Sequence, residues 1–340
     1  LAEHKGGYST FRVDLTEHLK EENLLAISVD NSDNDTVYPQ KADFTFYGGI
    51  YRDVTLHIVP AEHFALPANG APALKVTPIV TDLAAKTAEV TVEAAVVGAQ
   101  SVTFALEGQS ITAPAENGTA KAVFTLHDAH LWDGVEDPFL YTVSAKLGNG
   151  EEASARFGCR KFEFDPQKGF ILNGRSYPLR GVSRHQDRKG AGIALTNEMM
   201  EIGANTIRLA HYQHAQHFYD LCDEKGLVIW AEIPYITMHM TNGRANTLTQ
   251  MEELIVQNYN HPCIAVWGLS NEITAASAVN EDLLENHRLL NELAHKLDPT
   301  RKTTMANVFM LGIDSPILEI PDVNSYNLYF GWYLGELEQN

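Results

Sequence analysis

Cysteine is scarce in this sequence, and the three that occur, Cys159, Cys222 and Cys263, stand far apart. Isolated cysteines in odd number make neither a disulfide framework nor a zinc site. We interpret them as small buried hydrophobic residues. Free cysteines fit a reducing compartment, so a cytoplasmic location is expected.

Long apolar runs are also missing. No stretch reaches the ~18 residues that a membrane-spanning helix needs, so no membrane partner is expected. Basic residues are few as well, because 25 Lys and Arg face 44 Asp and Glu, for a formal net charge of −19. Such a field repels nucleic acid and anionic membranes, which favours neutral or cationic ligands.

The chain of 340 residues is too long for one ordinary domain, and its pattern changes twice. Residues 1–60 contain alternating apolar runs, such as 11–15 and 25–29, which predict strands. Prolines and a glycine then mark a linker. Residues 61–158 carry short alternating strands between turn signals, which is typical of a small β-sandwich. Its clearest strands are expected at 88–97, 101–106, 120–126 and 140–147.

From residue 159 to residue 340, short apolar runs alternate with helical segments, which predicts a parallel sheet with helical crossovers. Strands are expected at 177–182, 206–210, 227–233, 264–270, 303–306 and 323–326, and helices at 215–225, 248–258 and 280–297. Ionisable and polar side chains follow several strands: Arg184, His185, His211, Glu232, Asn271 and Glu272. Catalytic groups at the carboxyl ends of successive strands favour a (β/α)8 barrel over a doubly wound sheet.

Glu272 is the strongest catalytic candidate. It follows the apolar run 264–270, and partial desolvation beside Trp267 would favour its neutral form. A neutral carboxylic acid can protonate a leaving oxygen near neutral pH, while the adjacent Asn271 can donate to a sugar hydroxyl. The structural alternative is a strand-end glutamate bridged to an arginine. Trp267 itself is interpreted as a core residue, not as a platform for a sugar ring.

Three histidines, His211, His214 and His217, are spaced three apart and suggest a metal site. Only His211 falls at a predicted strand end, however. We interpret the other two as solvated residues at the start of a helix. No metal ion is therefore expected there.

Four separated motifs resemble glycoside hydrolase family 2. Asn271-Glu272 after Trp267-Gly268-Leu269-Ser270 resembles the acid/base motif of that family. The runs 181–185 and 205–212 resemble its first two barrel strands, and 43–54 is similar to the end of its sugar-binding jelly roll. The resemblance implies a jelly roll (1–60, incomplete), an immunoglobulin-like sandwich (61–158) and a TIM barrel (159–340, strands one to six). It also implies retaining hydrolysis of a β-glycoside without a cofactor.

The resemblance assigns roles as well. Glu272 would be the acid/base, and Asn271 would hold the sugar 2-hydroxyl. The other expected substrate-binding residues are Asp43, His185, Arg208, His211 and Tyr329. Asp43 would reach into the barrel, and the two histidines would line the sugar subsite. Arg208 would support the carboxylate of the nucleophile, and Tyr329 would contact the nucleophile. Tyr326 is the competitor for the last role.

The sequence departs from the family in three places. No glutamate after Glu272 stands in the Glu-Tyr-Gly-like motif of the nucleophile, so we expect the nucleophile beyond Asn340. The stretch 194–203 is short for the first barrel helix, and we expect residues to be missing between Met199 and Met200. Ile236 and Met238 stand where some β-galactosidases of the family bind magnesium, so no magnesium is expected at that place.

The runs 184–190 and 230–235 look more like β-galactosidases than like other members. A small-molecule or oligosaccharide β-D-galactoside is therefore the expected substrate. The alternatives are a β-glucuronidase of the same family and a non-catalytic carbohydrate-binding remnant. A homo-oligomer is left open.

Overall fold

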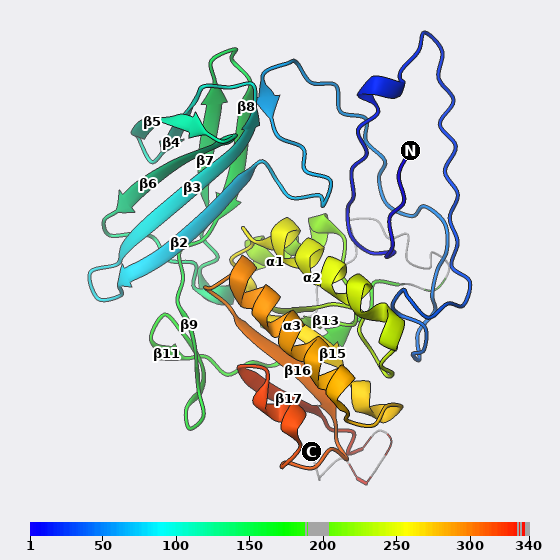
Figure 1. Ribbon diagram of the computed structural model, residues 1–340. Helices are drawn as coiled ribbons and strands as arrows, with labels where there is room; N and C mark the ends of the chain where they lie inside the picture. The colour runs from blue at the N-terminus through cyan, green and yellow to red at the C-terminus, as the bar shows by residue number, and fades with distance from the viewer. Residues whose placement is uncertain (188, 190–203, 332, 334, 337–340) are drawn as a thin grey trace.

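The computed structural model describes residues 1–187, 189, 204–331, 333, 335 and 336. Figure 1 shows an N-terminal segment of irregular chain, an antiparallel β-sandwich, and a parallel sheet with helices packed along one side of it. None of the helices in these residues has the length and apolar content that crossing a bilayer requires. The suspected gap between Met199 and Met200 lies outside the described residues.

The sandwich confirms the expected antiparallel architecture. Its strands pair in the order β1-β3-β6-β5-β4-β7-β8, with β2 on the other side of β3. Every second residue of β6 and β7 is buried, so each strand turns one face toward a shared core. The bounds are β1 His63–Phe64, β2 Leu74–Asp82, β3 Thr87–Val97, β4 Ser101–Leu106, β5 Gln109–Glu116, β6 Thr119–Leu126, β7 Tyr141–Leu147 and β8 Glu152–Phe157. A short helix, η2 (Gly134–Glu136), precedes β7.

Residues 1–60 do not form the predicted strands. Their one regular element is the short helix η1 (Thr16–His18). The runs 11–15 and 25–29 find no pairing strand among the described residues, and Leu25, Ile27 and Val29 are exposed. An alternating pattern gives a strand only where a neighbour pairs with the backbone and one face is buried. The prediction of strands in this segment was therefore wrong.

Helix α2 (Arg244–Asn258) holds this segment instead. Four buried polar residues recur every three or four positions along one face of the helix: Asn246, Gln250, Glu253 and Gln257. Asn246 accepts from the Tyr38 amide at 2.8 Å, and Gln257 accepts from the Thr10 amide at 3.1 Å and donates to the Thr10 carbonyl at 2.8 Å. Glu253 pairs with His4 at 2.8 Å. The segment is thus ordered by side chains of the barrel.

A small antiparallel sheet separates the sandwich from the barrel. Its strands are β9 (Phe162–Asp165), β10 (Gly169–Leu172) and β11 (Arg175–Ser176). Asn173 and Gly174 have φ of +49° and +79°, as a two-residue hairpin turn requires. The prediction that the chain from residue 159 onward forms only a parallel sheet was therefore wrong, because this Asn-Gly turn specifies a hairpin.

The parallel sheet confirms six barrel strands. They pair in sequence order, β12-β13-β14-β15-β16-β17, and every pair is parallel. The bounds are β12 Gly181–Arg184, β13 Thr206–Leu209, β14 Val228–Glu232, β15 Ile264–Asn271, β16 Lys302–Val308 and β17 Val323–Asn327. The helices are α1 Gln216–Lys225, α2, and α3 Glu281–Leu297, with the short helices η3 Thr241–Gly243, η4 Ile273–Ala275 and η5 Pro316–Glu319. Asn280 caps α3 by accepting from the Leu283 amide.

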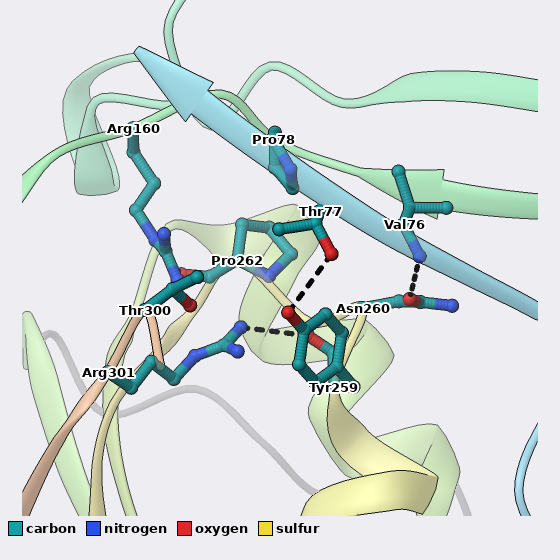
Figure 2. Close-up of a pocket in the computed structure, with 10 residues that line it drawn as sticks. Val76, Thr77, Pro78, Arg160, Tyr259, Asn260, Pro262, Thr300 and Arg301 are labelled. Atoms are coloured by element: carbon teal, nitrogen blue, oxygen red, sulfur yellow. Dashed lines mark hydrogen bonds between the residues drawn. The ribbon is translucent and has the colours of Figure 1, made fainter. Parts of the chain in front are cut away.

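The sandwich and the barrel meet around a small pocket (Figure 2). On one side lies β2, whose Val76 amide donates to Asn260 at 2.8 Å and whose Thr77 hydroxyl lies 3.0 Å from the hydroxyl of Tyr259. On the barrel side, Arg160 donates to the Pro262 carbonyl at 2.9 Å. These paired polar groups fix the sandwich at the end of the barrel where β15 begins.

Candidate functional site

Polar residues from four strands meet at the carboxyl edge of the parallel sheet. Glu232, Asn271 and Asn327 are the last residues of β14, β15 and β17, and Arg208 comes from the end half of β13. Parallel strands end at the same edge, so these side chains converge although they are far apart in sequence. Glu272 follows Asn271 directly and joins the same cluster.

Glu232 is the buried carboxylate of this cluster. Arg208 donates from Nε to Oε2 at 2.8 Å and from Nη2 to Oε1 at 3.1 Å, and His211 Nδ1 donates to Oε1. Burial alone would raise the pKa of Glu232, but the charges of Arg208 and His211 outweigh it and lower the pKa. Glu232 is therefore ionised, and its side chain is fully buried beneath Arg208 and His211, so it is not exposed to a substrate. The bond at Nδ1 leaves Nε2 of His211 for a ligand.

Arg208 also orients the two asparagines. Its Nη2 donates to Asn271 Oδ1 at 2.7 Å, and its Nη1 donates to Asn327 Oδ1 at 2.9 Å. Four of the five guanidinium donors are thus in use, which leaves one for a further carboxylate. Asn327 Nδ2 donates to the same Asn271 oxygen at 2.9 Å. Because that oxygen is occupied, Nδ2 is the atom of Asn271 that a sugar hydroxyl could accept from, and this role stays a prediction.

Glu272 is held by one of its two oxygens. Oε1 accepts from the Tyr329 hydroxyl at 2.5 Å and from Asn327 Nδ2 at 3.0 Å. Burial first, and then the bond to Glu272, raise the pKa of Tyr329, so the phenol stays protonated and donates. Oε2 remains for a substrate. Tyr329 was expected to contact the nucleophile, but here it bonds the candidate acid/base, so its contact with a nucleophile stays a prediction. The hydroxyl of the competitor Tyr326 is buried with no hydrogen-bond partner among the described residues.

The backbone of Glu272 is in the left-handed region, with φ of +47° and ψ of +34°. This conformation costs roughly 1–3 kcal/mol in a residue with a side chain. The Glu272 amide compensates in part by donating to the Ala306 carbonyl at 2.8 Å. Just before it, the register of β15 against β16 shifts between Gly268 and Asn271, which marks a β-bulge.

Trp267 is a core residue, as predicted. Its side chain is fully buried, and its Nε1 donates to Asp298 at 2.9 Å. It is therefore not the neighbour that we expected to desolvate Glu272. The side chains in contact with that carboxyl are Tyr329 and Asn327.

The two histidines expected at the sugar subsite lie side by side. The ring centroids of His185 and His211 are 5.2 Å apart, and the ring of Phe44 lies 4.8 Å from His185 and 6.1 Å from His211. Burial lowers the pKa of His185, while the charge of Asp43 is among those that oppose this shift. The ring of Phe44 thus reaches the histidine pair from a remote part of the sequence, and the role of its exposed neighbour Asp43 as a sugar ligand stays a prediction.

His214 differs from the interpretation as a solvated helix residue. Its side chain is fully buried, lies 3.1 Å from Arg184 Nη1, and packs against the rings of Tyr212 and Phe218. Burial lowers its pKa far below the ordinary value, so it is neutral. His217 is exposed, as predicted.

Two residues of the site were not identified from the sequence, Asn327 and Phe44, and Glu232 was placed at a strand end without a role. Asn327 is also the last residue of a strand, so the rule for strand ends could have found it. Phe44 stands beside Asp43 in a jelly-roll motif, and nothing in its pattern indicates that its ring reaches the barrel.

Another group of ligand-type residues lies away from this site. Asp220, Asp223 and His261 are close enough to share an ion. Asp223 already accepts from His261 at 2.6 Å and from the Cys263 amide at 3.1 Å, and Asp220 pairs with Arg156 at 3.0 Å. We therefore regard the group as a hydrogen-bonded network. The expectation of no magnesium beside Ile236 and Met238 stays a prediction.

Replacing Glu232 by glutamine should weaken both the site and the fold. The variant removes the charge that faces Arg208, and loss of one partner of a buried ion pair costs about 3–5 kcal/mol. We expect a drop of this order in the free energy of unfolding, measured in urea. Glu224→Gln, which breaks an exposed pair with Arg156, should cost less than about 1 kcal/mol. Equal losses of unfolding free energy in the two variants would show that the buried pair stabilises the fold no more than the exposed pair.

Comparison with known proteins gives a consistent result. Residues 166–339 match the family described as "Glycosyl hydrolases family 2, TIM barrel domain", and residues 68–160 match "Glycosyl hydrolases family 2". The range 68–160 contains strands β2 to β8 of the sandwich, and the range 166–339 contains the parallel sheet and the cluster around Glu272.

Individual relatives carry two activity names. A β-glucuronidase of Bacteroides fragilis is 34% identical over 98% of this chain and 52% of its own length. A β-galactosidase of Thermoanaerobacter pseudethanolicus is 30% identical over 96% of this chain and 45% of its own. The crystal structure of an FMN-binding β-glucuronidase from Facaelibacterium prausnitzii L2-6 is 43% identical, covers 91% of this chain and 51% of that one, and has a TM-score of 0.84. The chain thus spans about half the length of the relatives it matches. It belongs to glycosyl hydrolase family 2.

Proposed function

We propose that this chain carries the acid/base half of a retaining β-glycosidase site. The observation that carries the proposal is the arrangement around Glu272. One carboxyl oxygen is fixed by Tyr329 and Asn327, and the other accepts no hydrogen bond from the described residues. A carboxyl group held in this way can deliver a proton to one defined point, which is the oxygen of the scissile glycosidic bond.

The chemistry would proceed in two steps. Glu272 first gives its proton to the departing oxygen while a second carboxylate attacks the anomeric carbon. Glu272, now ionised, then takes a proton from a water molecule that displaces the enzyme from the sugar. Asn271 Nδ2 and His211 Nε2 are placed to bind sugar hydroxyls during both steps.

The second carboxylate is proposed to come from beyond Asn340. The carboxylate of Glu232 is fully buried, which argues against this role for it. The known relatives are about twice as long as this chain. A further solved structure, of Bacteroides uniformis β-glucuronidase 2, is described as covalently bound to cyclophellitol-6-carboxylate aziridine. A covalent adduct with a sugar mimic supports a nucleophile in that relative, and by similarity here.

For the sugar, we propose a β-D-glucuronide. The sequence favoured a β-galactoside, but the curated relatives with higher identity, from Bacteroides fragilis and Formosa agariphila, are named as a β-glucuronidase and a putative β-glucuronidase. The curated β-galactosidases are 30% identical or less, although a solved structure described as a putative β-galactosidase is 36% identical. These names favour the alternative, a β-glucuronidase, over the galactosidase that the sequence suggested.

The preferred sugar can be measured with three nitrophenyl glycosides. A glucuronide and a glucoside differ only at C6, where a carboxylate replaces a hydroxymethyl group, so their ratio isolates recognition of the charge. Charge-assisted hydrogen bonds contribute about 1.5–3 kcal/mol, so kcat/KM for the glucuronide should exceed that for the glucoside by roughly 10- to 100-fold.

The galactoside tests the competing assignment. It should be hydrolysed more slowly than the glucuronide. A galactoside that is preferred over both other substrates would restore the galactosidase assignment. Binding of sugar without turnover of any of the three would favour a non-catalytic carbohydrate-binding protein.

A further inference from the structure

A buried hydrogen bond joins strand β15 to helix α3 just before the catalytic motif. Ser270 Oγ lies 2.8 Å from His287 Nε2, and His287 Nδ1 lies 2.8 Å from the Leu283 carbonyl. A carbonyl can only accept, so Nδ1 carries the proton and donates. Burial lowers the pKa of His287 to about 4, so the ring is neutral and Nε2 accepts from the Ser270 hydroxyl. The direction of both bonds is thereby defined.

Ser270 occupies a special place in the strand. The pairing of β15 with β16 passes from Gly268–Thr304 to Asn271–Ala306, so three steps on β15 match two on β16. Ser270 lies inside this bulge, and a bulge redirects the residues that follow it. The residues that follow are Asn271 and Glu272, and Glu272 has the left-handed backbone described above.

The backbone that follows the bulge is held by the chain on both sides of β15. The Asn271 amide donates to the Tyr235 carbonyl at 3.0 Å, and the Glu272 amide donates to Ala306. Ser270 is held differently, because its side chain bonds to His287. His287 belongs to helix α3, which packs on the outside of the sheet. The ring of Tyr235 packs against the ring of His287, with 5.1 Å between the ring centroids.

We propose that His287 is a positioning residue that, through Ser270, fixes the bulge of β15 and thereby aims the carboxyl of Glu272. This inference depends on the proposed acid/base role of Glu272. Without the bond, the bulge can relax while the strand stays paired on both sides. The proton donor would then be displaced, although substrate would still bind.

Two variants and their combination test the proposal. His287→Phe keeps a ring but loses the acceptor, and Ser270→Ala removes the donor with little change in volume. Each should lower kcat about tenfold on a phenyl glycoside of the preferred sugar, which needs the proton, with KM little changed. A dinitrophenyl glycoside, whose leaving group needs no proton, should keep its rate of glycosylation within about twofold. The double variant should be no slower than either single one, because both remove the same bond.

A matched control lies on the same helix. His295 Nδ1 also bonds the carbonyl four residues earlier, at 2.8 Å, but its Nε2 faces Asp322, away from Glu272. His295→Phe should leave both substrates unaffected. Equal losses on both substrates in His287→Phe and Ser270→Ala, no loss at all, or independent losses that multiply in the double variant would each overturn the proposal. Glu272→Ala, assayed in parallel, tests the acid/base role separately from the positioning role. If the loss in Glu272→Ala does not depend on the leaving group, the proposed function fails. If the loss in Glu272→Ala depends on the leaving group but the loss in His287→Phe does not, only the positioning role fails.

Discussion

Glu272→Ala should slow hydrolysis of an unactivated glycoside by about 10²–10⁴-fold, the usual contribution of general acid–base catalysis. The loss should depend on the leaving group. A dinitrophenolate departs without a proton, so the glycosylation step of a dinitrophenyl glycoside should be nearly spared. Steady-state and pre-steady-state rates on the two substrates measure this difference, in the protein that contains this chain together with the second carboxylate.

Azide provides the independent check on Glu272→Ala. It needs no general base, so it can attack the glycosyl-enzyme from the face where activated water normally arrives, and it should restore turnover with a β-glycosyl azide as product. Tyr329→Phe serves as the comparison, because it leaves the carboxyl of Glu272 in place and azide should not rescue it. If Glu272→Ala slowed both substrates equally and azide had no effect, the acid/base assignment would have to be withdrawn.

Asp298→Asn should destabilise the barrel by about 3–5 kcal/mol, the cost of leaving one charge of a buried pair without its partner. Asp298 is fully buried and accepts from Arg301 at 2.7 Å, from Trp267 at 2.9 Å and from the Thr300 hydroxyl at 2.6 Å. Urea denaturation followed by tryptophan fluorescence measures the loss, because Trp267 reports on this place directly.

The same residue predicts a dependence on pH. Burial would raise the pKa of Asp298, but Arg301 and the hydrogen bonds outweigh it and lower the pKa from 3.8 to about 2. The stabilisation is therefore complete above about pH 4 and is lost as the pH falls through 2, for a total of about 2 kcal/mol. In Asp298→Asn this part of the acid sensitivity should disappear.

The control for Asp298 is an exposed pair on α3. Glu285→Gln breaks the contact of Glu285 with Arg288 at 3.2 Å and should cost less than about 0.5 kcal/mol. If the two variants lost the same free energy, the network around Asp298 would not be what stabilises this end of the barrel.

The sequence predicted the barrel well because each strand and helix of the barrel can be recognised from its own residues. Each strand of the sheet is a short apolar run with a helical or polar segment after it, and this pattern needs no knowledge of distant residues. The catalytic edge followed from the same rule, since residues just after strands meet at one edge. Glu232, Asn271 and Glu272 were placed there in this way, with the family motif as support for the last two, whereas Arg208 was assigned from the family resemblance alone.

What the sequence could not show depends on distant partners. The run 25–29 alternates like a strand, yet a strand exists only when another pairs with it. Tyr329 and Asn327 come from the end of the sixth strand to hold Glu272, and no local pattern indicates such a bond. The hairpin at Asn173-Gly174 was different. Its turn signal is local, and we overlooked it because the barrel pattern was assigned to the whole region.

The polar face of α2 holds one side of the site, and the parallel sheet forms the other side. The two sides differ in stability. The strands that carry Glu272 and Arg208 exchange hydrogen bonds along a continuous sheet, so they open only when the barrel unfolds. Phe44 and Asp43 belong to a segment without strands, which is held by side-chain bonds to α2, such as those of Asn246 and Gln257, and by contacts such as the stacking of Tyr8 on Tyr212. That segment can detach at a lower free energy. Under partial denaturation, Phe44 and Asp43 would therefore leave the proposed sugar subsite while Glu272 stayed in place. Affinity for substrate would then fall at a lower denaturant concentration than the one that unfolds the barrel.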